Sequence, residues 1–241
     1  MGLRILHADY PEVADLRERY RAEARCQVVH DSVLPRGLAD PYLVLAGGRV
    51  AGYAGVWNKY HEGRIMELYI VPTLRPRTRH IVEELLQVSG ATQIEAQTNM
   101  PHMLATLREW TDSVVEEKLL FEDDHTTRLP CPAGALRQAT EHDGESRGEW
   151  LIDVNGQVVA GGGVLHHYNP PYGDIYMEVS DSERRKGFGS YLVQELKRIC
   201  HESGKRPAAR CDPSNRASRR TLERAGFVTC GWLLAGEIRP L

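Results

Sequence analysis

Hydrophobic and polar positions along the chain follow the same succession of strand-like and helix-like periods twice. In the first half, short apolar or alternating runs predict strands, and apolar residues spaced three and four apart predict helices, as at Ile81, Val82, Leu85 and Leu86. The predicted strands are 3–8, a hairpin over 41–57, 64–71, 92–97 and a pair at 114–122 and 125–129, and the predicted helices are 11–27, 79–88 and 102–110.

The second half repeats this order with clearer turn and stop signals. Asn155 and Gly156 form the strongest short hairpin signal in the chain, and Gly204 and Gly226 are typical of positions just after a helix. The predicted elements are a hairpin over 150–168, a strand at 174–180, a helix at 188–200, a strand at 206–212, a helix at 215–225 and a strand at 227–234.

The repeated order predicts an α/β protein, with a mixed sheet and helices on both faces, that is built from two similar halves. The Pro-containing segment 129–132 is the expected boundary, which gives domains 1–129 and 130–241. The second half has no room for a full strand and two helices before its hairpin. We therefore expect the second half to pack against the first half in place of these elements.

Composition places the chain among soluble globular proteins. Its 241 residues are 41% hydrophobic and 26% charged, and the mean hydropathy is −0.42, which excludes a disordered chain and a small disulfide scaffold. The longest uncharged stretch, 154–173, contains five glycines and two prolines, so no membrane span is predicted. Acidic residues stand where a signal peptide needs its apolar core, which indicates a cytoplasmic location.

Five cysteines, at 26, 131, 200, 211 and 230, form an odd set without a CxxC pair. Reduced, mostly buried thiols are therefore expected, with no metal site. Cys211 as a thiol nucleophile would need an activating base, and core packing is the favoured role. His166 and His167 end a predicted hairpin, where they could border a substrate or simply lie at the surface.

Charge is distributed unevenly although the net charge is only −3. Residues 183–224 hold twelve Lys or Arg against five Asp or Glu, a net charge of +7, whereas the remainder of the chain carries −10. A local basic segment on an acidic protein favours a compact polyanionic ligand over a nucleic acid. Arginine-rich helix surfaces that serve only solubility are the alternative.

A glycine-containing loop lies inside this basic segment, between a predicted strand and a predicted helix. Arg184, Arg185 and Lys186 precede Gly187, Phe188, Gly189 and Ser190. Glycines let the backbone approach an anion, and the N–H groups of the first helical turn point at it. The loop lacks the Gly-Lys-Ser/Thr of a Walker loop and the complete GxGxxG of a dinucleotide fold. It therefore predicts a phosphate site of another kind.

The second half, from Trp150 to the end, resembles the GNAT family of N-acetyltransferases. Residues 179–189 are similar to that family's strand followed by (Arg/Gln)-x-x-Gly-x-(Gly/Ala), and Asn215 with Gly226-Phe227 is similar to its second motif. The resemblance implies splayed central strands with acetyl-CoA, the acyl-donor substrate, in the opening and its pyrophosphate on the loop. The implied donor-binding residues are Met177, Val179, Arg184, Arg185, Lys186, Gly187, Phe188, Gly189, Ser190, Asn215 and Ser218.

The first half looks like the same fold with its binding loop lost. Residues 70–80 keep the strand and place Arg75 in register, but Thr78 and His80 stand where both glycines belong. A tandem protein with a degenerate N-terminal half is therefore expected. That half would not bind CoA, but would complete the fold and wall the acceptor pocket. An unrelated α/β domain is the alternative.

For catalysis, the resemblance implies direct attack of an amine on the thioester, with a backbone N–H near Met177 for the oxyanion. Asp174, Tyr176 and Glu178 alternate along one strand and share a face. We choose Glu178 as base and Tyr176 as a possible proton donor; a solvated strand carboxylate is the alternative for Glu178. Leu222 occupies the position of the family's usual tyrosine acid, which leaves the thiolate without its usual proton donor.

The sequence thus predicts an acetyl-CoA-dependent N-acetyltransferase whose second half acetylates a primary amine in a cleft between the halves. The acceptor is expected to be a small molecule or a peptide, with no nucleic acid or membrane as partner, and the sequence makes no prediction of oligomeric state. Two alternatives stay open. One is transfer of a longer acyl or aminoacyl group, and the other is a non-catalytic CoA-binding sensor.

Overall fold

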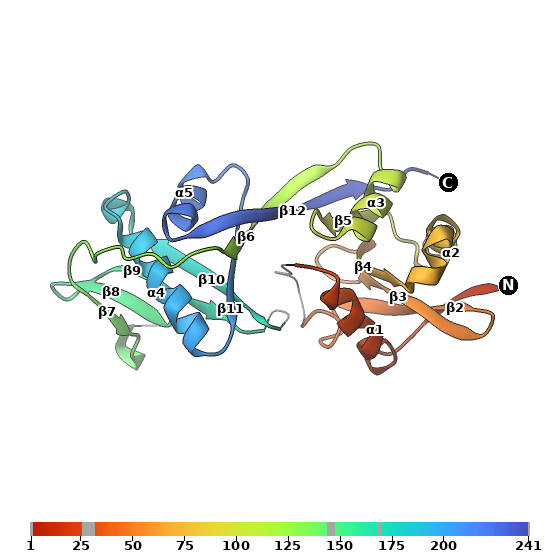
Figure 1. Cartoon of the computed structure of the whole chain (residues 1–241), viewed down its shortest axis with the longest axis horizontal. Coiled ribbons are helices and arrows are strands. Elements are labelled where there is room, and N and C mark those ends of the chain that lie inside the picture. The colour runs from red at the N-terminus through yellow and green to blue at the C-terminus, as the bar shows by residue number, and fades with distance from the viewer. Residues whose placement is uncertain (1, 26–31, 144–147, 168–169, 241) are drawn as a thin grey trace. The chain divides into compact units, whose positions relative to one another are not determined.

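The computed structural model describes residues 2–25, 32–143, 148–167 and 170–240. Two compact units emerge, which we call unit 1 (Met1–Lys118 with Gly231–Leu241) and unit 2 (Leu119–Cys230). Each unit contains a mixed sheet with one parallel pair of neighbouring strands, packed against helices (Figure 1). The expected mixed α/β architecture is therefore confirmed.

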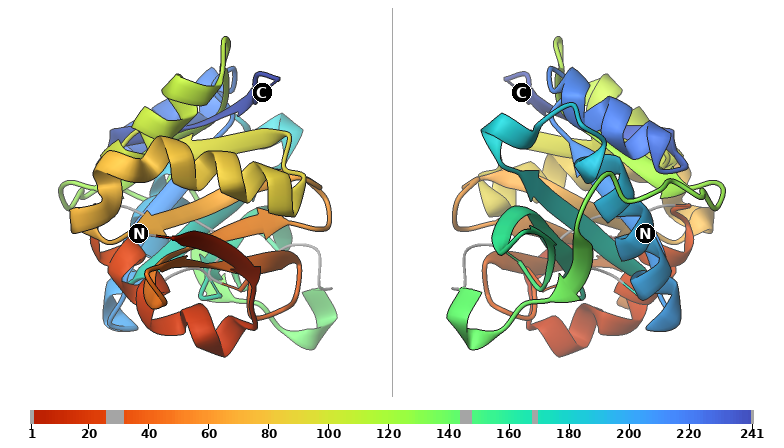
Figure 2. Two further views of the ribbon diagram at one scale, coloured as in Figure 1. Left: turned by 90° about the vertical axis from the view of Figure 1, so that its right-hand side faces the viewer. Right: turned by 90° about the vertical axis from the view of Figure 1, so that its left-hand side faces the viewer.

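Unit 1 has the strand order β1-β2-β3-β4-β5-β12, in which only β4 and β5 are parallel. Helices α1 and α2 cover opposite faces of this sheet (Figure 2, left). Its elements are β1 (Leu3–His7), α1 (Tyr10–Ala22), β2 (Ala39–Ala46), β3 (Arg49–Trp57), β4 (Arg64–Ile70), α2 (Thr78–Ser89), β5 (Gln93–Gln97), α3 (Pro101–Trp110) and the end of β12 (Phe227–Glu237).

Local sequence explains where the helices of unit 1 begin and end. Asp9 and Glu12 form a reciprocal capping box at the start of α1, so two backbone N–H groups gain acceptors. Gly90 ends α2 in the left-handed conformation, with φ of +65°, which glycine adopts without a steric penalty. The apolar face of α2 is fully buried, as its spacing predicts.

Unit 2 has the strand order β6-β11-β10-β9-β8-β7, in which only β10 and β11 are parallel. Helix α4 packs across β9 and β10 and contacts α5 (Figure 2, right). Its elements are β6 (Val115–Asp123), β7 (Ala135–Gln138), β8 (Trp150–Val154), β9 (Gln157–Leu165), β10 (Tyr172–Val179), α4 (Phe188–Glu202), β11 (Arg206–Cys211) and α5 (Arg216–Arg224).

The compact units differ from the expected division at 129/130. Strand β6 starts in the first half of the chain, yet its residues 119–122 pair with β11 of unit 2. Strand β12 starts in the second half, yet its residues 233–237 pair with β5 of unit 1. The last strand of each half thus completes the sheet of the other unit. Long-range pairing of this kind leaves no local signal in the sequence.

Most predicted elements are present to within a few residues, but the strand expected at 125–129 is wrong. These residues form a loop without regular secondary structure, and the Gln194 side chain on α4 bonds to Thr127 and to the backbone of Leu129. A side chain therefore takes the place of a neighbouring strand. The short edge strand β7 was not predicted. Residue Gln27, the expected end of the first helix, lies outside the described residues.

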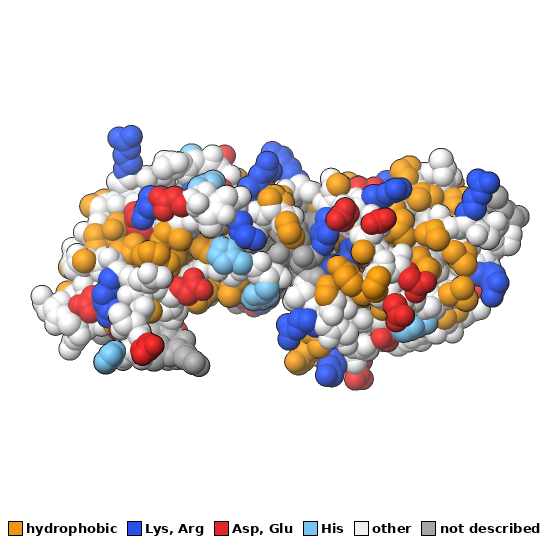
Figure 3. All heavy atoms as spheres, turned by 90° about the horizontal axis from the view of Figure 1, so that it is seen from below, with side chains coloured by type: hydrophobic (Ala, Val, Ile, Leu, Met, Phe, Trp, Pro, Cys, Tyr) orange, Lys and Arg blue, Asp and Glu red, His pale blue; other side chains and the backbone are white. Residues whose placement is uncertain are grey.

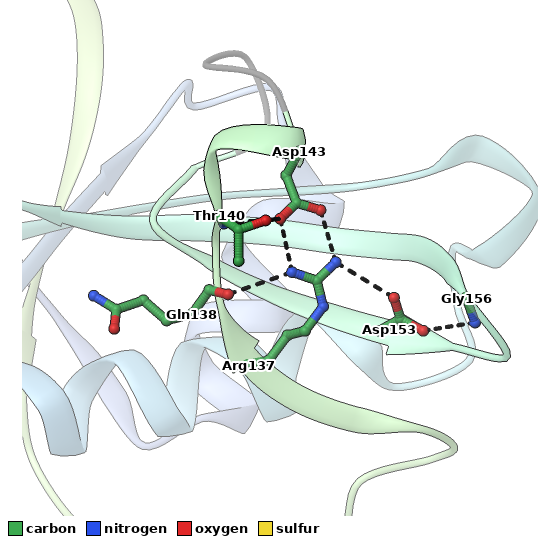
Figure 4. Close-up of polar contacts among 6 residues, drawn as sticks. All are labelled: Arg137, Gln138, Thr140, Asp143, Asp153 and Gly156. Carbon is green, nitrogen blue, oxygen red and sulfur yellow. Dashed lines mark hydrogen bonds and ion pairs between the residues drawn. The ribbon is translucent and has the colours of Figure 1, made fainter.

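Strand β7 is held at the sheet edge by an arginine with two acidic partners (Figure 4). The Arg137 guanidinium donates to both oxygens of Asp143 at 2.8 and 2.7 Å, and to Asp153 on β8 at 3.4 Å. Bonds from Arg137 and from Thr140 hold the pKa of Asp143 well below its usual range. The pairing of β7 with β8 is thus reinforced by side chains at both strands.

A buried ion pair connects α1 to the sheet of unit 1. Arg17, only 1% exposed, donates to both carboxylate oxygens of Glu67 at 2.8 Å each, and the Tyr53 hydroxyl donates to the same carboxylate at 2.8 Å. The Glu67 carboxylate therefore accepts three hydrogen bonds, two from the guanidinium in bidentate geometry and one from the phenol. Removal of one partner would leave the other charge buried and uncompensated.

We predict that Glu67→Gln lowers the free energy of unfolding by about 3–5 kcal/mol, the usual cost of breaking a buried ion pair from one side. Urea unfolding followed by circular dichroism measures it. The matched control is Glu83→Gln, which removes an exposed pair with Arg79 and should cost about 0–1 kcal/mol. Equal losses in the two variants would contradict the prediction.

Candidate functional site

The site starts where two neighbouring strands of unit 2 separate. Parallel pairing of β10 with β11 covers only three residue pairs and ends at Asp174 with Ala208. Beyond this point β10 still pairs with β9 as far as Val179, and β11 still pairs with β6 as far as Cys211. One edge of each strand therefore has no strand partner, so its backbone groups are open to a ligand. The splayed strands expected from the resemblance are present.

The glycine loop lies between β10 and α4, where the backbone is unusual. Gly187 has φ of +99° and the neighbouring Arg185 has φ of +65°, a conformation rarely adopted by residues with a side chain. Gly187 is the N-cap of α4, so the N–H groups of the first helical turn lack acceptors within the helix. Partial positive charge at this end favours an anion.

Gly189 is required for a different reason. A Cβ atom there would lie 3.2 Å from Thr221 Cγ2 on α5 and 3.3 Å from Val179 Cγ2 on β10. Both distances are tighter than ordinary van der Waals contact, so a larger residue would push α5 or β10 away from α4. The second glycine of the motif thus permits close packing at the start of the helix.

A cavity of about 710 Å³ opens over this loop. Its walls bring together most of the donor-binding residues predicted from sequence, namely Met177, Val179, Arg184, Arg185, Gly187, Gly189, Ser190, Asn215 and Ser218, together with Glu178. Asn215 has a structural role as well, because its side-chain oxygen caps α5 by accepting from the Ser218 N–H at 2.9 Å. Residues from β10, α4 and α5 therefore share one cavity.

Two of the predicted donor-binding side chains do not line this cavity. Phe188 is 3% exposed and belongs to the buried residues of α4. Lys186 is paired with Glu183, with its Nζ at 3.0 Å from both carboxylate oxygens. Their places in the motif are therefore explained by packing and by a local ion pair, respectively.

Helix α5 adds three arginines that the sequence analysis did not single out. Arg216, Arg220 and Arg224 are spaced by four, so they share one face of the helix, and all three line the cavity. None of them forms an ion pair within the part of the chain that the structure describes, whereas Arg219 on another face is paired with Glu223 at 2.8 Å. The helical spacing of these arginines was the signal available in the sequence.

Positive charge is thus gathered at the cavity. On the face of the molecule shown in Figure 3, by contrast, side chains of both signs are interspersed with hydrophobic ones. With a net charge of −3, the protein combines an overall acidic character with a strongly basic cavity. Such a field concentrates a compact polyanion at one place.

A second cavity, of about 290 Å³, shares Met177 and Ser218 with the first. Asp174, Tyr176, Arg210 and Leu222 also line it. Asp174 is 4% exposed, and burial raises the pKa of its carboxyl group to about 6, although Arg210 acts in the opposite direction. Burial, followed by the nearby Glu149, raises the pKa of Tyr176, so its phenol stays protonated at neutral pH.

The remaining candidates from the sequence differ in their surroundings. Glu178, in the wall of the large cavity, is exposed on β10. Cys211 is buried in β11, in accord with a packing role, and His166 and His167 are exposed just after β9. Among the described residues, no group of three or more His, Cys, Asp or Glu is placed to hold a metal ion. No described helix is both long and apolar enough to cross a membrane.

Unit 1 contains the corresponding strand, but the loop after it has no glycine turn. The Arg75 Nε donates to Ile70 O at 3.1 Å, just as the Arg184 Nε donates to Val179 O at 3.3 Å, five residues back in both cases. The glycine turn is absent, because a 3₁₀ segment (Pro72–Arg77) leads directly into α2. Thr78 is buried there, and its hydroxyl contacts Arg75 O and the His102 ring.

Comparison with known proteins agrees with this geometry. A sequence model described as the acetyltransferase (GNAT) family matches residues 107–227, just over half of the chain. A search of curated proteins found no match.

Solved structures share the fold over nearly the whole chain. An acetyltransferase from the GNAT family of Colwellia psychrerythraea has a TM-score of 0.81 at 13% identity, covering 99% of this chain and 100% of that one. A tandem GNAT protein from the clavulanic acid biosynthesis pathway has a TM-score of 0.66 at 16% identity, with 100% coverage of both chains. A GCN5-related N-acetyltransferase from Sphaerobacter thermophilus has a TM-score of 0.61 at 16% identity, covering 99% and 96%. At these identities the structures support the fold alone. The family is shown by the sequence match over residues 107–227, which includes the glycine loop and the splayed strands. The chain therefore belongs to the acetyltransferase (GNAT) family.

Proposed function

We propose that the protein is an N-acetyltransferase that uses acetyl-CoA as acyl donor and a primary amine as acceptor. Membership of the family supports acyl transfer from an acyl-CoA. The single observation that carries the proposal is the basic cavity of unit 2, which joins a glycine turn, an open helix N-terminus and the separated edge of β10. These three features suit a phosphate-bearing thioester better than a simple anion.

Different parts of the cavity would bind the pyrophosphate, the pantetheine arm and the thioester of the donor. Backbone N–H groups at residues 188–190 would bind the pyrophosphate. Arg184, Arg185 and the arginines of α5, which line the cavity, would supply cations around it. The pantetheine arm could add amide hydrogen bonds to the open edge of β10. On this arrangement the thioester reaches the separation of β10 from β11, next to Met177, whose backbone N–H stays the predicted oxyanion donor.

The chemistry is direct transfer. The amine nitrogen attacks the thioester carbonyl carbon, the C–N bond forms, and the C–S bond breaks with the electron pair leaving on sulfur. The ammonium form of a lysine-like amine has a solution pKa of about 10.4, so one proton must leave before the attack and a second as the amide forms. The thiolate is protonated or released as such. The sequence alone predicted Glu178 as the base and Tyr176 as the acid. Leu222, at the family's usual acid position, is buried and cannot supply a proton.

Several finer predictions stay proposals of the same kind. The acceptor is proposed to be a small molecule or a peptide. Unit 1 is proposed not to bind CoA, because Thr78 stands at the position of the first glycine and its hydroxyl bonds to Arg75 O. A cytoplasmic location and the absence of nucleic acid and membrane partners remain predictions from the sequence.

We predict that Gly187→Val and Gly189→Val each weaken CoA binding at least tenfold, as measured by isothermal titration calorimetry. Valine at 187 would force the turn out of its positive φ, and valine at 189 would displace α5 or β10. Gly90→Val is the matched control, because Gly90 also has a positive φ but ends a helix of unit 1. Unchanged affinity in folded loop variants would remove the basis of the proposed site.

We predict that Arg220→Gln weakens CoA binding by about 10- to 150-fold, because a charge-assisted contact to a phosphate contributes about 1.5–3 kcal/mol. The difference from the unaltered protein should shrink as salt is added. Arg219→Gln serves as control, since Arg219 lies on the same helix but is paired with Glu223. Equal weakening by both substitutions would mean that only the overall charge of α5 matters.

A further inference from the structure

The smaller cavity of unit 2 contains a buried carboxylate to which the proposed function has given no role. Asp174 ends the parallel pairing of β10 with β11, and its side chain lines the cavity. One carboxylate oxygen, Oδ2, lies 3.4 Å from Arg210 Nε. The other, Oδ1, is buried and has no hydrogen-bond partner among the residues that the structure describes.

A buried carboxylate oxygen without a donor is costly, because the charge has lost water and gained nothing in return. A ligand that brings a cationic N–H donor into the cavity would remove this cost. Arg210 already lies beside the other oxygen, so the unused oxygen is the place for such a donor. The cavity therefore suits a group with a positively charged nitrogen.

The position of the cavity connects this property to acyl transfer. Met177 and Ser218 belong to the walls of both the small cavity and the large one. A donor bound on the glycine loop and extended along the open edge of β10 would bring its thioester to this shared wall. The nucleophile must approach that thioester within a few ångströms, so the small cavity is a natural place for the acceptor nitrogen.

Resting on the proposed function, we propose that Asp174 binds the acceptor as a primary alkylammonium ion and then accepts its proton. The ammonium N–H donates to Oδ1, a proton passes to the carboxylate, and the freed nitrogen lone pair attacks the thioester carbon. The C–S bond then breaks and CoA leaves. As the amide forms, the nitrogen loses its second proton to the departing thiolate, so that CoA leaves as the free thiol, and the proton on Asp174 returns to solvent. The substrate class is a basic alkylamine rather than a weakly basic arylamine.

This proposal gives Asp174 the role that the sequence analysis assigned to Glu178. The two residues share a face of β10, but Glu178 is exposed and Asp174 is buried at the start of the strand separation. An exposed carboxylate is surrounded by water and holds an ammonium ion weakly. A buried carboxylate with an unused oxygen holds it strongly and responds to its protonation state.

The groups that face Asp174 define its pH behaviour. Arg210 comes from β11 and Tyr176 from β10, whereas Leu165 of β9, Val193 of α4 and Ser218 and Leu222 of α5 complete the wall without charge. Burial raises the pKa of Asp174 from 3.8 to about 6. The contribution of the protonated Asp174 carboxyl to the stability of the fold is therefore fully present below about pH 4, and it is lost as the pH rises through 6. Above pH 6 the free protein carries the carboxylate that the ammonium ion needs.

The main experiment compares Asp174→Asn with Glu178→Gln in the full-length protein. Acetyl-CoA and primary alkylamines from ethylamine to hexylamine are the probes, thiol release is the activity readout, and aniline is the weakly basic comparison. We expect Asp174→Asn to lower kcat/KM at least 100-fold, and at least tenfold more than Glu178→Gln, with CoA affinity unchanged. Glu202→Gln, an exposed carboxylate near the end of α4, is the control for loss of one negative charge.

Two further readouts separate a catalytic role from a structural one. The kcat/KM of the unaltered protein should rise as pH passes through about 6, and this rise should be absent in Asp174→Asn. The melting temperature of Asp174→Asn, relative to the unaltered protein, should increase between pH 4 and pH 8, since the variant lacks the carboxylate whose ionisation destabilises the free fold.

The outcomes are distinguishable from failure of the proposed function. If the unaltered protein does not bind CoA, the proposed function fails. A second outcome is that the protein binds CoA, but does not acetylate alkylamines, and alkylamines do not stabilise its CoA complex against heat. The inference about Asp174 is then overturned, while the proposed donor site is retained. It is also overturned if Asp174→Asn keeps activity within threefold, if Glu178→Gln loses more, or if aniline is the better acceptor.

Discussion

The separation of β10 from β11 after a single short stretch of parallel pairing is the constraint on which the rest of unit 2 depends. Each strand is held on its outer side, β10 by β9 and β11 by β6, so the gap between them does not close. The gap exposes backbone groups that would otherwise form a ladder, and it gives α4 and α5 an opening to flank. The glycine loop supplies an anion site at the end of β10, so a ligand can lie along the open edge and be held at its charged end.

Unit 1 also has a parallel strand pair that separates, but polar side chains of the protein itself lie at the separation. Parallel pairing of β4 with β5 ends at Ile65 with Ile94, after two residue pairs. Beyond that point, buried carboxylates on the two strands are paired within the protein, Glu67 with Arg17 and Glu95 with Arg64. Burial raises the pKa of Glu95 to about 7 despite this arginine. The strand separation of unit 1 is thus lined by the chain's own polar side chains, and with Thr78 in place of the first glycine it has become part of a folded core.

The sequence allowed the helices, most strands and the glycine loop to be predicted, because periodicity and turn residues are local properties of the chain. The exchange of β6 and β12 between the units could not be predicted in this way, since an antiparallel partner is chosen by three-dimensional pairing and both strands look the same whichever sheet they join. The loop at 125–129 was misjudged for a related reason: the backbone N–H and C=O of Leu129 bond to Gln194, a side chain far away in sequence. Alternation along β10 correctly put Asp174, Tyr176 and Glu178 on one face, but it contained no information on which of them would be buried.

That difference in burial also bears on the missing tyrosine acid. Leu222 replaces it and packs in the wall of the same small cavity that Tyr176 lines. An apolar residue there lowers the local polarity around Asp174 and makes its unused oxygen more dependent on a bound cation. Tyr176, 37% exposed and protonated at neutral pH, remains on the same strand, two residues further along. A base and a proton donor from one strand would need no contribution from α5, so the loss of the tyrosine at position 222 is compatible with catalysis arranged along β10 alone.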